Sequence, residues 1–287
     1  MGAAFYIQQV LNGLSFGALL FLVASGFTLV FGLMRVSNLA HGSFYLIGAF
    51  VGIVSAGFTR SFILGVVAGA ATAAVVGLIV QRGLLRRLAN QEMAEVLVTV
   101  GVSFVIADLA LVIFGGTPRS MGAAVDMPSG SLEIGGFSYP WYRLFVIVFT
   151  VLIGIMLYVV QNRTRIGAIV RAGVDNREMT AAIGIRINRV FTGVFIFGAL
   201  LAGLAGAIGS GVTSVNASSG TEILLYAMVV VIIGGLGSVT GAAVGATAIG
   251  LIDAFTKVWI PEFAYFTVFA PMAIMLVVRP RGLFGKV

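Results

Sequence analysis

Long apolar runs, separated by short charged or glycine-containing breaks, are the feature that most limits how this chain can fold. Such runs recur along all 287 residues, and a helix needs about 20 apolar residues to span a bilayer. Apolar residues make up 60% of the sequence and charged residues 9%, which is more apolar surface than a water-soluble domain can bury. The runs do not alternate apolar and polar residues, so they do not fit a transmembrane barrel. The sequence therefore predicts an all-α, polytopic transmembrane helix bundle.

Nine apolar segments are candidates for the helices of this bundle. They are 5–33, 39–58, 62–81, 93–114, 142–160, 190–212, 223–236, 239–256 and 263–278. The region 223–256 is too long for one simple span and is interrupted by glycines at 234–237, so we expect two short spans or a re-entrant pair there. Small residues four apart, such as Gly65 and Gly69, indicate close helix packing inside the bundle. The whole of 1–287 is predicted to be one transmembrane domain with about eight or nine spans.

The basic residues gather in three clusters, which predict the topology. They are residues 82–87, the segment 161–190 and the tail from 279. Because basic residues are enriched in cytoplasmic loops, all three are expected in the cytoplasm, with the N-terminus outside and the C-terminus inside. The segment 115–141 is then a periplasmic loop, and its turn-rich sequence favours a short hairpin. This placement of charge explains the basic composition without any nucleic-acid partner.

The sequence offers little for enzymatic chemistry. It has one histidine and no cysteine, and it contains no Walker A pattern for binding ATP. No pair of carboxylates has a spacing suited to acid–base catalysis, and no metal site is expected. Asp108 and Asp253 lie near the ends of apolar segments, where each is expected to reach water. Without a buried carboxylate relay, a pump driven by its own ion gradient is disfavoured.

Two membrane segments carry unusual residues. Residues 26–45 join two apolar runs through a polar stretch, in which Ser37 or Asn38 can cap the second helix and His41 lies one turn further on. For His41 alone, a structural hydrogen bond is favoured over contact with substrate. The glycine-rich residues 234–241 predict a helix break, which is either part of a transport pathway or a simple tight turn.

The segment 161–190 has the signals of a short cytoplasmic helix. Asp175 is expected to cap a helix that reaches about 183, with Glu178 at the capping-box position and Gly184 at its end. Its small residues Ala181 and Ala182 suit docking into a groove of another protein. The alternative is a solvated basic loop that only sets the topology.

The segments 26–45, 162–185, 234–241 and 278–285 together resemble the permease subunits of bacterial branched-chain amino-acid ABC importers of the Liv type. Within that family the chain is more similar to the H-type permease than to the longer M-type. The resemblance implies that 161–190 is the coupling loop of the ATPase subunits. Glu178 and Gly184 keep the outer spacing of the general coupling motif, whereas Met179 and Thr180 replace its two alanines.

The resemblance also implies the partners and the place of action. These are two cytoplasmic ATP-binding subunits that hold ATP and Mg, a second homologous permease in a homodimer or heterodimer, and a periplasmic substrate-binding protein. This chain would bind no cofactor of its own and would lie in the bacterial inner membrane. The expected cargo is a branched-chain or other small neutral amino acid, or a related amide or urea. The alternative is a self-contained secondary transporter or channel for small neutral solutes.

Two groups of candidate residues follow from these interpretations. The expected coupling residues are Arg171, Asp175, Arg177, Glu178, Ala181, Ala182 and Gly184. The expected substrate-pathway residues are Asn38, His41, Gly42, Tyr45, Thr99, Gly101, Gly234, Gly235, Gly237 and Ser238.

Overall fold

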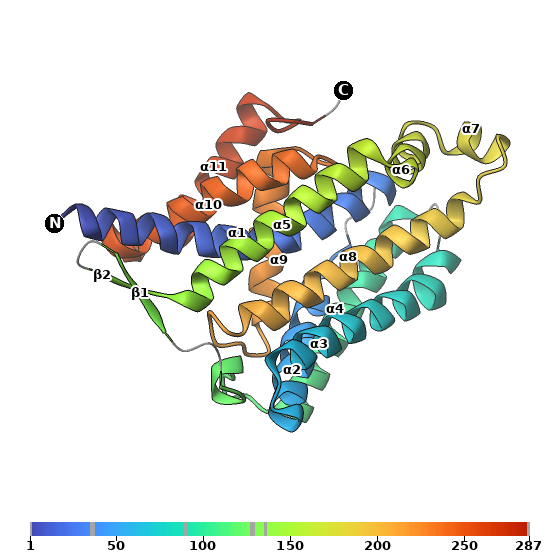
Figure 1. Ribbon diagram of the computed structural model, residues 1–287. Helices are drawn as coiled ribbons and strands as arrows, with labels where there is room; N and C mark the ends of the chain where they lie inside the picture. Colours follow the sequence, from blue (N-terminus) through green and yellow to red (C-terminus); the bar gives the residue numbers. More distant parts are fainter. Residues whose placement is uncertain (1, 35–37, 89–90, 127–129, 135–136, 286–287) are drawn as a thin grey trace.

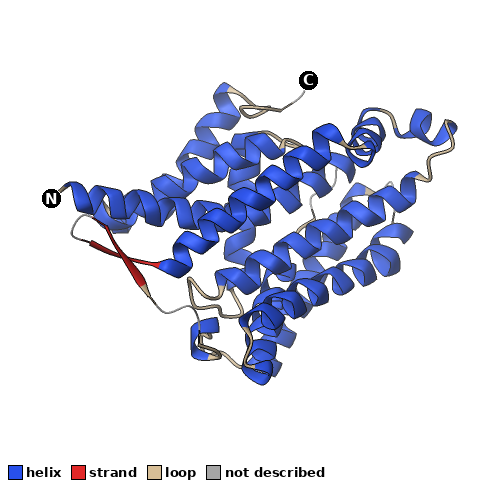
Figure 2. Cartoon of the chain, in the orientation of Figure 1, coloured by secondary structure: helices blue, strands red, loops and turns tan. Residues whose placement is uncertain are grey.

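The computed structural model describes residues 2–34, 38–88, 91–126, 130–134 and 137–285, and helices account for most of them (Figure 2). The helices are α1 (Ala3–Met34), α2 (His41–Thr59), α3 (Phe62–Ile79), α4 (Glu92–Phe114), α5 (Trp141–Arg163), α6 (Arg165–Asp175), α7 (Arg177–Ala182), α8 (Ile187–Gly209), α9 (Ser219–Gly234), α10 (Val239–Trp259) and α11 (Ala264–Val278). Short elements complete the fold: the π turn η1 (Val80–Leu84), the 3-10 turns η2 (Leu85–Arg87), η3 (Met121–Ala123) and η4 (Pro261–Phe263), and the strands β1 (Ser131–Ile134) and β2 (Phe137–Pro140). The predicted all-α bundle is confirmed.

Eight helical segments of the described chain are long and apolar enough to cross a membrane. They are α1, α2, α3 with its following turns, α4, α5, α8, α10, and α11 with η4. The ninth apolar helix, α9, has 16 residues, or about 24 Å at 1.5 Å per residue. The predicted break in 223–256 is confirmed, because α9 and α10 are separate helices joined by residues 235–238.

Helices α1 and α10 run antiparallel along most of their lengths. A Cβ added to Gly17 of α1 would lie 2.7 Å from the carbonyl oxygen of Ala246 in α10, so the two backbones are in contact there. Near the start of α1, the ring of Tyr6 lies 6.5 Å from the ring of Trp259 at the end of α10. Small residues at the crossing allow this close approach.

A second group of closely packed helices consists of α2, α3 and α8. A Cβ on Gly65 of α3 would lie 2.7 Å from the carbonyl oxygen of Gly52 in α2. Gly69, one turn later, faces the backbone of Gly48 in the same way. The predicted packing of small residues inside the bundle is therefore confirmed.

The three basic clusters lie at one end of the bundle, and the N-terminus lies at the other (Figure 1). The C-terminal tail joins the basic end by two hydrogen bonds: Leu283 N donates to the carbonyl oxygen of Ile233 at 2.9 Å, and Phe284 N donates to that of Gly234 at 3.0 Å. One orientation in a membrane thus puts all three clusters on the same side, as the sequence predicts.

The opposite end carries the connection 115–141, which includes the predicted hairpin. Strands β1 and β2 pair antiparallel, with Leu132 opposite Tyr139. The Tyr139 side chain is buried, and this burial raises the pKa of its phenol. Just beyond β2, Arg143 of α5 donates a hydrogen bond to Asn12 of α1, which joins the first turn of α5 to α1.

Candidate functional site

The stretch before α2 is held by side chains that accept hydrogen bonds from its backbone. Asn38 Oδ1 accepts from Ala40 N at 3.2 Å, two residues on, which forms a turn before the helix. The N-cap of α2 is Ala40, without a capping side-chain bond, so the prediction that Asn38 caps α2 was wrong; the other candidate, Ser37, lies outside the described residues. Thr99 of α4 reaches the same stretch, because its Oγ1 accepts from Leu39 N at 3.2 Å. The structure therefore brings Thr99 to Leu39, which lies between Asn38 and His41, although 60 residues separate Thr99 from Leu39 in the sequence.

His41 is fully buried at the first position of α2. Its Nε2 lies 3.1 Å from the carbonyl oxygen of Val23 in α1, and its ring meets those of Phe27 and Phe44 edge to face. The structural hydrogen bond favoured by the sequence is thus present. The His41 Nδ1 and the Asn38 Nδ2 have no hydrogen-bond partner within the described part of the chain. Buried polar atoms of this kind are rare and often have a functional reason.

Gly42 and Tyr45, on the following turn of α2, are in close backbone contact with neighbouring helices. A Cβ on Gly42 would overlap the carbonyl oxygen of Gly220 in α9. The carbonyl of Tyr45 lies against Gly206 of α8 in the same way, and its hydroxyl lies beside Gly209. The start of α2 is therefore locked between α8 and α9.

Gly101 differs from the other predicted pathway residues. It is exposed on α4, and a Cβ built on it meets no described atom within 4 Å. The structure does not bring Gly101 to the polar cluster around His41.

The glycine-rich residues after α9 form a tight turn at the basic end of the bundle. Gly235 and Gly237 have φ angles of 101° and 81°, which L-residues with side chains rarely adopt. Gly237 N donates to Thr28 Oγ1 of α1 at 2.9 Å, and Ser238 Oγ caps α10 by accepting from Gly241 N at 3.0 Å. Gly234 packs against Gly241. Of the two interpretations, the tight turn is the one that the geometry matches.

A cavity of about 880 Å³ lies beside this turn. Its walls come from the last turns of α1 and α5, from α6, and from residues 236–240. The predicted coupling residue Arg171 and the predicted pathway residues Gly237 and Ser238 thus line one space. This cavity therefore lies between the predicted coupling loop and the turn that joins α9 to α10.

The predicted coupling loop, residues 161–190, contains a helix that the sequence did not indicate. Helix α6 is capped by Thr164, whose Oγ1 accepts from Gly167 N at 3.3 Å. Val170 and Val174 of α6 pack against Ile187 at the start of α8. On the same helix, Arg171 donates to the carbonyl oxygen of Gln161 at the end of α5. These contacts fix α6 to the bundle, so α7 is held at a defined position beyond it.

Helix α7 is the predicted short helix, but its cap was assigned one residue too early. Asn176, in extended backbone conformation, accepts from Met179 N at 2.9 Å through Oδ1. Asp175 is instead the last residue of α6, so it cannot also be the first cap of α7. Arg177 is the first residue of α7. The predicted end is confirmed, because Gly184 has a φ of 87° just after the helix.

One face of α7 is open to solvent. Ala181 and Ala182 are exposed as predicted, and so is Glu178. The larger apolar residues Met179 and Ile183 are 64% and 69% exposed. They are four residues apart and therefore share a side of the segment. Sequence reasoning missed these two residues, although their apolar character at this spacing was the signal that could have found them.

The prediction for Asp253 was wrong. Asp253 does not reach water but is only 3% exposed in α10. Lys257 Nζ lies 2.7 Å from its Oδ2, and Tyr226 of α9 donates to its Oδ1 at 3.1 Å. Asp108 is exposed, as expected. A buried acid in a span usually pairs with a cation or another polar group, and the i, i+4 lysine is the sequence signal for this pair.

A family model described as "Branched-chain amino acid transport system / permease component" matches residues 9–278. The high-affinity branched-chain amino acid transport system permease protein BraD of Pseudomonas aeruginosa is 26% identical over 297 residues, covering 98% of this chain and 96% of BraD. LivH of Escherichia coli (strain K12), which bears the same description, is 26% identical over 98% of this chain and 96% of LivH. The probable permease LivH of Methanocaldococcus jannaschii is 24% identical over 97% and 92%. No solved structure gives a significant match.

Proposed function

The chain belongs to the family of permease components of branched-chain amino acid transport systems, and from this membership we propose that it is the permease subunit of an ATP-driven importer. Its proposed cargo is a branched-chain amino acid, which the names of BraD and LivH state for those proteins, or another small neutral amino acid. The proposed setting is the inner membrane, with the basic end and the C-terminus in the cytoplasm.

The observation that carries this proposal is the solvent-facing surface of α7. A capped helix that exposes Met179 and Ile183 at the basic end of the bundle has an apolar surface suited to a protein partner. Since the sequence contains no Walker A pattern, the partner must supply ATP hydrolysis. We assign this surface to a cytoplasmic ATP-binding subunit. The complete transporter would contain two such subunits, each bound to one permease of a pair.

The proposed route for energy runs through α6. Arg171 ties α6 to the end of α5, and the cavity lined by Arg171, Gly237 and Ser238 lies between α6 and the start of α10. Movement of α7 would therefore change the spacing between α6 and the turn at residues 235–238. Such a movement can open and close the two sides of the bundle in alternation.

The proposed pathway residues are those around the start of α2. Asn38 and His41 carry buried polar atoms without a partner in the described chain, and Thr99 lies beside them. These groups suit a neutral, zwitterionic solute better than a metal ion, and the described residues contain no group of three acidic, histidine or cysteine side chains that could hold a metal.

A pair of matched substitutions tests the proposal. Ala182 and Ala123 are both exposed alanines on short helical segments, at opposite ends of the bundle. In vesicles that contain the complete transporter, Ala182→Arg should reduce ATP-driven amino-acid uptake and substrate-stimulated ATP hydrolysis at least tenfold, whereas Ala123→Arg should leave both near wild type. The proposal fails if Ala182→Arg is without effect, or if the purified chain alone transports the amino acid without ATP.

A further inference from the structure

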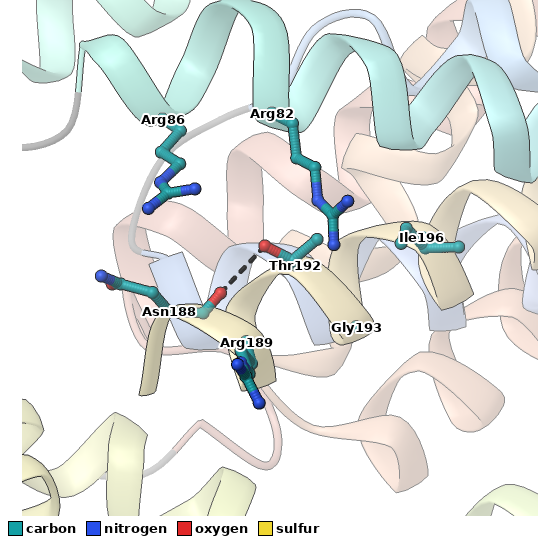
Figure 3. A pocket seen from close by; sticks show the side chains of 7 residues that line it. All are labelled: Arg82, Arg86, Asn188, Arg189, Thr192, Gly193 and Ile196. Atoms are coloured by element: carbon teal, nitrogen blue, oxygen red, sulfur yellow. Dashed lines mark hydrogen bonds between the residues drawn. The ribbon is translucent and has the colours of Figure 1, made fainter. Parts of the chain in front are cut away.

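A groove lies between the end of α3 and the start of α8, at the basic end of the bundle (Figure 3). It has a volume of about 560 Å³ and is separate from the cavity beside α6. The lining residues are Arg82, Arg86, Asn188, Arg189, Thr192, Gly193 and Ile196. Neither the coupling loop nor the proposed pathway accounts for this groove.

Three exposed arginines give the groove a strong positive charge. Val80 and Leu85 of the turns η1 and η2 are buried, whereas Arg82 and Arg86 of the same turns are exposed. Figure 3 shows these two side chains extending from their helix toward α8, and Arg189 lies on α8 itself. None of the lining residues is acidic.

The positive charge of these arginines is not neutralised by the described chain. The ion pair found among the described residues joins Lys257 to Asp253, far from the groove in the sequence. Within the residues that the structure describes, no ion pair is formed by Arg82, Arg86 or Arg189. Figure 3 shows the Arg82 and Arg86 side chains extending from the same side of their helix, so an anion bound between them would lower the electrostatic free energy.

Exposed apolar side chains lie next to the arginines, as at the edge of a membrane. Ile196 lines the groove, and Ile79 and Leu84, in the helix that carries Arg82, are 62% and 42% exposed. Gly193 leaves the wall of α8 open, since a Cβ there would meet no described atom within 4 Å. A cationic rim above exposed apolar side chains matches a molecule with an anionic head and an apolar tail.

We propose that this groove binds the phosphate of an anionic phospholipid. The planar guanidinium groups of Arg82 and Arg86 can each donate two hydrogen bonds to phosphate oxygens, with Arg189 adding charge from the other wall. The acyl chains extend along the exposed apolar face of α3. Basic pockets between transmembrane helices are known to hold lipid headgroups of this kind. The bound lipid connects α3 to α8 at the end of the bundle that carries the coupling loop.

Native mass spectrometry of the purified full-length chain in detergent tests this proposal. Phosphatidylglycerol, phosphatidylethanolamine and inorganic phosphate are added separately, and the bound fraction is measured over a range of concentrations. We expect phosphatidylglycerol to bind more tightly than phosphatidylethanolamine. One arginine near a membrane surface contributes about fivefold in affinity, so Arg82→Gln with Arg86→Gln should weaken phosphatidylglycerol binding by about 25-fold.

The matched control is Arg279→Gln with Arg281→Gln, which removes two exposed arginines from the same end of the bundle. This control should bind phosphatidylglycerol as the wild type does. The variant Arg82→Lys with Arg86→Lys keeps the charge and should retain intermediate affinity, which separates lost binding from lost folding.

Three results would overturn the proposal. Equal weakening by the groove and tail variants would mean that only net charge attracts the lipid. Inorganic phosphate that binds as tightly as phosphatidylglycerol would identify a free anion as the ligand. The third result concerns the groove variant, Arg82→Gln with Arg86→Gln. If this variant binds lipid as the wild type does but no longer associates with the ATP-binding subunit, the occupant of the groove is an acidic protein surface.

Discussion

The Nε2 atom of His41 lies 3.1 Å from the carbonyl oxygen of Val23, and this contact marks where α2 begins. Val23 precedes Met34, the last residue of α1, by 11 residues (34 minus 23), or about 16 Å of helix. Helix α2 therefore starts deep beside α1 instead of level with its end. This depth brings polar residues of the joint into the interior of the bundle.

Replacing His41 should separate its structural role from its proposed contact with substrate. His41→Ala removes the contact with Val23 and leaves a cavity between Phe27 and Phe44, so it should reduce the free energy of unfolding by about 2–4 kcal/mol. His41→Gln keeps a polar group and should be closer to wild type in stability. Thermal melting in detergent measures the stability, and amino-acid uptake in vesicles measures transport. Normal uptake by a stable His41→Gln variant would contradict a pathway role.

Two glycine substitutions should have opposite effects. Gly42→Ala places a methyl group on the carbonyl of Gly220, so α2 and α9 must separate, with an expected loss of about 1–3 kcal/mol and of uptake. Gly101→Ala adds a methyl group in an open position of α4 and should stabilise that helix by about 0.5–1 kcal/mol. Melting temperature and uptake of both variants check this, and similar behaviour of the two would refute the close contact between α2 and α9.

The ion pair of α10 gives a prediction about buried charge. Lys257→Met leaves the buried Asp253 carboxylate with Tyr226 as its remaining described partner, so we expect a loss of about 1–3 kcal/mol. Adding Asp253→Asn should restore much of this loss, because the neutral amide has less need of a cation. Melting temperatures of the single and double variants measure the effect. A double variant that melts below the Lys257→Met variant would contradict this account.

The cap of α7 can be tested against its neighbour in sequence. Asn176→Ala removes the hydrogen bond to Met179 N and should cost α7 about 1 kcal/mol, reducing ATP-driven uptake several-fold through less frequent docking. Asp175→Ala leaves that cap in place and is the matched control. Uptake and ATP hydrolysis should fall together in the first variant alone. An equal decrease in both variants would instead assign the effect to the charge or shape of the loop.

The segment 161–190 shows how far local sequence signals extend. Gly184 could be predicted as the end of α7, because a glycine at positive φ ends a helix through contacts within a few residues. The cap was misplaced because Asp175 and Asn176 are both good capping residues. The choice between them depends on α6, which continues to Asp175 and is stabilised by packing against α8. Met179 and Ile183 could be recognised as a candidate docking surface only from the structure, which shows that both are exposed.

The predicted pathway residues Thr99 and Gly101 have different positions in the structure because helix packing, and not the local sequence, decides which side of α4 faces the bundle. Thr99 reaches Leu39, between Asn38 and His41, because α4 packs beside the joint before α2, and nothing near Thr99 in the sequence indicates that contact. Gly101 lies only two residues from Thr99 in the sequence, yet it faces outward on α4. Two residues along a helix change the direction of a side chain by about 200°.

The sequence by itself determined the helical bundle, its spans and breaks, the gathering of basic residues between spans and the family. The bundle, its breaks and the basic clusters follow from hydropathy, charge and glycine content, which act within one segment or its immediate neighbours, whereas the family follows from the resemblance of four segments taken together. The tertiary structure alone decided the depth at which α2 begins, the burial of Asp253, the position of α6 and the groove between α3 and α8. Each of these depends on backbones that touch across distant parts of the chain, where the presence or absence of a single Cβ sets the distance between helices.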